Sequence, residues 1–67
     1  MVFEGLKIGD TIRVSGEVLY GDNIYRVATN AVILGIGEER SLVTLDEIDG
    51  DFNATVVVPN QIISTLS

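Results

Sequence analysis

Hydrophobic and polar residues alternate with a period of two over much of the chain, and this spacing predicts β-strands. The clearest strand is predicted over residues 11–20. One face of this segment carries Ile12, Val14, Gly16, Val18 and Tyr20. The opposite face is polar, and Leu19 is its one exception. Gly21-Asp22-Asn23 follows as a hairpin turn, because glycine adopts the positive φ that such turns need.

Three further segments show strand patterns. Residues 24–36 form a long strand whose alternation is interrupted near 28–30, so we expect a bulge or bend there that lets one strand serve both halves of a barrel. Residues 41–47 form the third strand, and an acidic loop is predicted over 46–51. In the fourth strand, 52–58, the inward residues are predicted to be Phe52, Ala54, Val56 and Val58.

Pro59 ends the fourth strand because proline cannot donate to a ladder. A single helical turn over 59–62 and a short last strand over 63–66 complete the chain, and no segment shows a sustained helical period. The pattern predicts an all-β fold: one domain, residues 1–67, built as a small antiparallel β-barrel or rolled sheet of about five strands.

This order resembles that of SH3-like barrels in the broad sense. The resemblance lies in residues 6–14 (LKIGDTIRV), which lead into the first hairpin, and in residues 57–63 (VVPNQII). An OB-like fold is the alternative. The aromatic cluster of true SH3 domains is missing, since the chain has only two Tyr and two Phe and no Trp. The resemblance therefore implies the fold and not the binding of proline-rich peptides.

Composition narrows the means of stabilising so short a chain. The 67 residues contain no Cys and no His, which excludes disulfides, thiolate metal sites and the commonest zinc ligand; no cofactor is expected. Hydrophobic residues make up 46% of the chain. A domain of this size buries only about 60% of its surface on folding, so we expect the excess apolar surface to form a homo-oligomeric contact.

The net charge of -6 is concentrated in the second half, where residues 37–67 hold six acids and one base, Arg40. Such a chain repels phosphate groups, so direct binding to nucleic acid or to an anionic membrane is not expected. No apolar run reaches the roughly 20 residues of a membrane helix. The absence of cysteine and of a signal sequence predicts synthesis in the cytoplasm.

Motifs for chemistry are few. Gly35-Ile36-Gly37 begins like a dinucleotide-binding loop, but Arg40 stands where the third glycine belongs and no helix follows. Residues 46–51 do not fit the register of an EF-hand calcium loop. Without a histidine base or cysteine nucleophile, no catalytic residue is identified, and the protein is predicted not to be an enzyme.

Two sets of residues are candidates for binding. Apolar residues on faces that should be wet predict a self-association surface of Leu19, Val57, Val32 and Leu34, one of the last two pointing away from Ile33. A surface for another protein is predicted from Asp46, Glu47, Asp49, Asp51, Tyr20 and Tyr25. The two tyrosines flank the first turn, so they could instead be a cross-strand pair that fixes the hairpin register.

The sequence thus predicts a non-enzymatic interaction or structural module that self-associates, as an accessory subunit of a larger assembly such as a phage particle. One alternative is an acidic inhibitor whose carboxylates imitate nucleic-acid phosphates and block a basic site. The other is a binder of a small ligand held between protomers at the glycine-rich turn 35–37.

Overall fold

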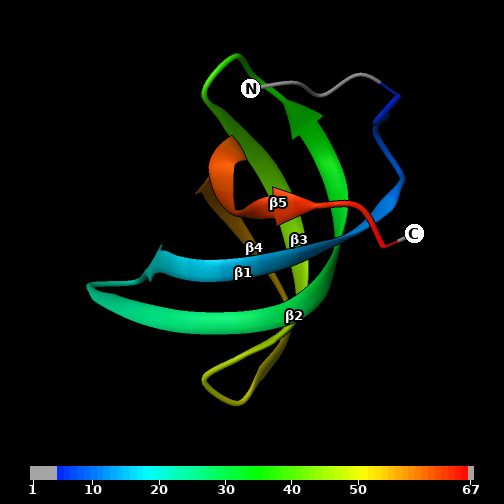
Figure 1. Cartoon of the computed structure of the whole chain (residues 1–67). Helices are drawn as coiled ribbons and strands as arrows, with labels where there is room; N and C mark the ends of the chain where they lie inside the picture. The colour runs from blue at the N-terminus through cyan, green and yellow to red at the C-terminus, as the bar shows by residue number, and fades with distance from the viewer. Residues whose placement is uncertain (1–4, 67) are drawn as a thin grey trace.

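The computed structural model of the chain describes residues 5–66. These residues form one antiparallel sheet of five strands and a single 3₁₀ turn, η1 (Figure 1). In chain order the elements are β1 (Thr11–Tyr20), β2 (Asn23–Ile36), β3 (Arg40–Ile48), β4 (Asp51–Pro59), η1 (Asn60–Ile62) and β5 (Ile63–Ser64). The predicted all-β fold is confirmed, and the strands begin and end within about two residues of their predicted limits.

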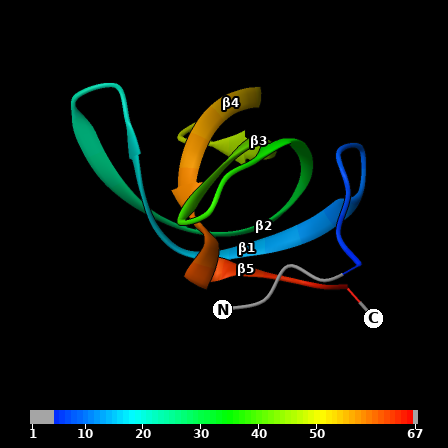
Figure 2. The ribbon, with the colours of Figure 1, turned by 90° about the horizontal axis from the view of Figure 1, so that it is seen from above.

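The strands lie in the order β4-β3-β2-β1-β5, and no ladder joins the two outer strands among the described residues. The fold is therefore a rolled sheet and not a closed barrel. Figure 2 shows how the sheet curls, so that β4 faces β1 across the interior. The 3₁₀ turn that leads into a short last strand beside β1 fits the order expected from the SH3-like resemblance.

Strand β2 serves both halves of the sheet, as predicted. It pairs with β1 through residues 23–32 and with β3 through residues 31–36. Of the bulge or bend predicted near 28–30, the bulge is wrong, because the register with β1 runs there without a shift. The register shifts instead between Ile33 and Gly35, so Leu34 is the extra residue of a bulge that faces β3.

The core lies inside the curl of the sheet. The buried hydrophobic residues are Ile12, Val14, Val18, Ala31, Ile33, Val43, Leu45, Ile48, Ala54, Val56, Val58 and Ile63. Ala54, Val56 and Val58 point inward as predicted, but Phe52 is 72% exposed. Asn53 has a φ of 58°, and this left-handed backbone interrupts the alternation of β4. On β3 the phase also changes, which buries Ile48 in place of Phe52.

The acidic segment 46–51 is a hairpin and not a loop. Asp46 and Glu47 belong to β3, and Ile48 pairs with Asp51 across a two-residue turn. Asp49 and Gly50 both have positive φ, 50° and 83°, which is the conformation of a type I′ turn. Asp49-Gly50 therefore forms a tight turn, and Asp46, Glu47 and Asp51 lie on the two paired strands that flank it.

Asn60, in η1, fastens the turn between β2 and β3. Its backbone N–H donates to the Glu39 carbonyl at 2.9 Å, and its side-chain Nδ2 donates to the carbonyls of Gly37 and Glu38 at 3.0 and 3.1 Å. The Ser41 hydroxyl donates to Asn60 Oδ1 at 2.7 Å. Both Ser41 and Asn60 are buried. We call these bonds the Asn60 network.

Candidate functional site

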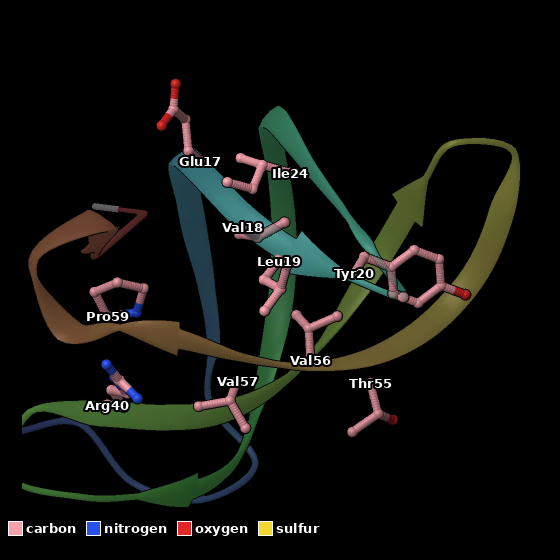
Figure 3. A pocket seen from close by; sticks show the side chains of 11 residues that line it. Glu17, Val18, Leu19, Tyr20, Ile24, Arg40, Thr55, Val56, Val57 and Pro59 are labelled. Carbon is pink, nitrogen blue, oxygen red and sulfur yellow. The ribbon is translucent and has the colours of Figure 1, made fainter.

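A groove of about 670 Å³ lies between the end of β1, with its turn into β2, and the edge strand β4 (Figure 3). The sheet places it there because the roll brings β1 and β4 near each other without pairing them. The residues that line the groove are Glu17, Val18, Leu19, Tyr20, Gly21, Ile24, Arg40, Thr55, Val56, Val57 and Pro59.

The groove has an apolar rim. Leu19 on β1 is opposite Ile24 on β2, and their side chains are 64% and 68% exposed. Val57 comes from β4 and is 53% exposed. Each of the three occupies the outward position of its strand, next to core residues such as Val18 and Val56. The rim is therefore apolar surface that the fold leaves in contact with water.

Charged residues flank this rim at both sides. Glu17 accepts a hydrogen bond from Arg26 at 3.4 Å, and both side chains are largely exposed. Such a surface pair contributes little to folding stability. Arg40 lies beside Pro59, its partner on the β3–β4 ladder. An occupant of the groove would thus meet an apolar centre between an acid and a base.

The structure brings together two of the four predicted self-association residues, Leu19 and Val57. Val32 and Leu34 lie on β2 outside the groove; Val32 is half-buried and Leu34 is exposed at the bulge. The sequence interpretation missed Ile24, because the phase of β2 was not evident from its pattern. The pairing of Leu19 with Ile24 follows once the register of the β1–β2 hairpin is known.

Four of the predicted partner-binding residues form two hydrogen-bonded pairs. The Tyr20 hydroxyl donates to Asp51 Oδ2 at 2.7 Å, and the Tyr25 hydroxyl donates to Asp49 Oδ2 at 3.1 Å. The rings lie with their centroids 6.2 Å apart, so the tyrosines are also an aromatic pair across β1 and β2. These Tyr–Asp pairs join the tips of the two hairpins.

Raising the pH above 10 should weaken this link. The hydrogen bond to Asp51 raises the pKa of Tyr20, and the bond to Asp49 raises the pKa of Tyr25. A tyrosine whose native pKa lies above its unfolded value stabilises the fold fully below about pH 10, and this contribution is lost as pH rises through the native pKa. Urea unfolding between pH 8 and 11 should therefore show a steeper loss of stability in the wild type than in Y20F/Y25F. Equal slopes would contradict the link.

The six acidic residues in 37–67 fall into two groups at opposite ends of β3. Glu38 and Glu39 lie in the turn before this strand, and Asp46–Asp51 lies at its far end. Residues 40–45 of β3 lie between the groups and separate Glu39 from Asp46 by about 20–25 Å along the strand. Within residues 5–66, no group of three or more acidic side chains is arranged to hold a metal ion. The same part of the chain contains no helix long and apolar enough to cross a bilayer.

Comparisons with protein-family models, with curated proteins and with solved structures gave no match. The likeness to SH3-like barrels is therefore one of strand order, and the groove and the Tyr–Asp pairs have to be interpreted from their own geometry.

Proposed function

We propose that this protein is a non-enzymatic interaction module that associates with itself and acts as an accessory subunit of a larger protein assembly. The observation that carries the proposal is the apolar rim of the groove, Leu19, Ile24 and Val57. Contiguous exposed apolar residues rimmed by polar ones are typical of protein interfaces. Burying this rim against another copy would remove from water the apolar surface that one small sheet cannot cover.

The assembly would offer a second contact to a different protein at the tips of the hairpins. Asp46 and Glu47 are exposed on β3, and Asp49 and Asp51 are held near them by the tyrosines. A basic surface would suit this acidic end. An accessory protein of a phage-type particle, made in the cytoplasm, fits this combination of a self-contact and a separate partner contact.

The two alternative functions receive less support from the geometry. An inhibitor that imitates nucleic acid needs its carboxylates close together on one face, whereas residues 40–45 of β3, which hold no acid, separate the two acidic groups. A ligand at the turn 35–37 would need the backbone groups of that turn, and the carbonyls of Gly37 and Glu38 already accept from Asn60.

Placing two charges on the rim should abolish self-association. In L19K/V57K, lysines replace two apolar contacts and repel their copies across the interface, so we expect Kd to rise by about 100-fold or more. Sedimentation equilibrium over a concentration series, at low and high salt, measures this. The matched control is I8K/L66K, which also adds two charges, at residues that are 67% and 50% exposed and outside the groove. A wild type that stays monomeric at every concentration would refute self-association.

A further inference from the structure

Among the described residues, strand β4 pairs along one edge only, with β3, and its other edge has free N–H and C=O groups. The bond from the Asn60 N–H to the Glu39 carbonyl continues the β3–β4 ladder, in which Arg40 is opposite Pro59. In an antiparallel ladder, the backbone N–H and C=O groups of successive residues point to opposite edges of the strand. Ala54, Val56 and Val58 therefore exchange hydrogen bonds with β3. The N–H and C=O groups of Thr55 and Val57 therefore point away from the sheet, toward the groove.

The opposite wall of the groove is also an unpaired edge, but it is a charged one. In β1 the odd-numbered residues direct their backbone groups away from β2, since the Ile33 N–H donates to the Asp10 carbonyl in the same register. Strand β5 pairs only with Arg13 and Val14, so within residues 5–66 no strand pairs with the edge groups of Glu17 and Leu19. A charge such as Glu17 is one of the ways in which proteins protect an edge from pairing.

The β4 edge has no such charge. Residues 52–60 are all uncharged, in a chain of net charge -6. The left-handed Asn53 and the proline at 59 limit the regular part of this edge to residues 54–58. Irregular backbone and proline both stop strand pairing. The edge is thus short, neutral and bounded at both ends, which favours one register over many.

We infer that the self-association proposed above takes place by antiparallel pairing of β4 with β4 of a second copy, about a two-fold axis at Val56. This inference rests on the proposed function. The axis sets Thr55 of each copy opposite Val57 of the other, so the free donors of both residues meet free acceptors. The two sheets join into one of ten strands, with the apolar rims beside the seam.

Charge favours the antiparallel arrangement. The tip of each β3–β4 hairpin carries four acids and no base, whereas the other end of β4 lies beside Arg40, the one base in residues 37–67. Antiparallel pairing places the Arg40 end of one copy beside the acidic tip of the other and keeps the two tips apart. Glu38 and Glu39 share the Arg40 end, which still holds less negative charge than the tip. A parallel pairing would bring the two acidic tips together.

Backbone hydrogen exchange locates the contact. In the wild type, measured by NMR at concentrations below and above the association midpoint, the amides of Thr55 and Val57 should slow by tenfold or more on association. The amide of Ile8, which is exposed and lies outside the groove, serves as an internal control and should not change. Association with unchanged exchange at Thr55 and Val57 would overturn strand pairing while leaving self-association intact. A wild type that never associates would refute both proposals.

Thr55→Pro tests the same edge in a second way. Proline removes an outward N–H that β3 does not use, so the monomer should fold, as far-UV circular dichroism would show. Two intermolecular hydrogen bonds are lost per dimer, and we expect Kd to rise by about thirtyfold. Thr55→Ala keeps the N–H and should change Kd by less than about threefold. Equal Kd values for the two variants would overturn the inference. Open-ended polymers, or a foreign peptide found bound to β4 by native mass spectrometry, would also overturn it.

Discussion

Asn60→Ala should lower the free energy of unfolding by about 3 kcal/mol, because it removes three side-chain hydrogen bonds and leaves the buried hydroxyl of Ser41 without its acceptor. For a domain of this size that corresponds to a fall in melting temperature of about 15 °C. The effect should be this large because one amide connects η1 to the β2–β3 turn, which is more than 20 residues away in the sequence. Urea unfolding at neutral pH measures it.

Two further variants show whether the loss of stability comes from the side-chain hydrogen bonds of Asn60. Asn60→Asp keeps an acceptor for Ser41 but cannot donate to the carbonyls of Gly37 and Glu38, so it should be nearly as destabilising. Gln61→Ala changes the exposed neighbour and should cost less than about 0.5 kcal/mol. If Asn60→Ala unfolds at the same urea concentration as the wild type, the Asn60 network does not stabilise the fold.

Gly16→Ala should be comparably destabilising, by about 3 kcal/mol, for steric and backbone reasons together. A Cβ at this position would lie 2.7 Å from Ile62 Cγ2, and Gly16 has a φ of 154°, a conformation that other residues rarely adopt. The glycine is what allows η1 to pack closely over β1. Thermal and urea unfolding of the variant give the measurement.

The two contributions can be separated. An Ile62→Ala background removes the 2.7 Å contact to Cγ2 and keeps Cβ at 3.1 Å, so Gly16→Ala should there cost less, about 2 kcal/mol. Gly5→Ala is the matched control for backbone strain alone, since Gly5 has a φ of 85° and an added Cβ would meet nothing within 4 Å. We expect it to cost about 1 kcal/mol. The same loss for Gly16→Ala with and without Ile62 would show that the contact is unimportant.

Regular alternation explains why much of the fold is predictable from the sequence. Strand β1 has the predicted limits and the predicted faces, because its core residues repeat every second position and glycine follows it directly. Proline at 59 marks the end of β4 for a simple chemical reason. Local signals of this kind depend only on neighbouring residues.

The errors occur where the backbone departs from a regular strand. The sequence around Asn53 gives no sign of a left-handed residue inside a strand, so its alternation predicts Phe52 in the core, where Ile48 lies instead. The bulge at Leu34 was likewise misplaced. Such choices are decided by tertiary packing, which overrides local propensity.

The candidate site was only partly foreseeable. Leu19 and Val57 were recognised because each breaks an alternation, but their presence in one groove depends on how far the sheet rolls. The hydrogen bonds from Tyr20 to Asp51 and from Tyr25 to Asp49 span 31 and 24 residues. All four side chains are predicted from the sequence as partner-binding residues, but the hydrogen bonds between them are not predictable from it.

The position of β5 also bears on how the newly made chain acquires its fold. Strands β1 to β4 pair with their neighbours in chain order, so each hairpin can form as soon as its second strand has been synthesised. The second edge of β1 has no partner until Ser64 is available to pair with Arg13. On the ribosome, the three hairpins formed by β1 to β4 can therefore precede the completed sheet, and the second edge of β1 is paired last, by β5.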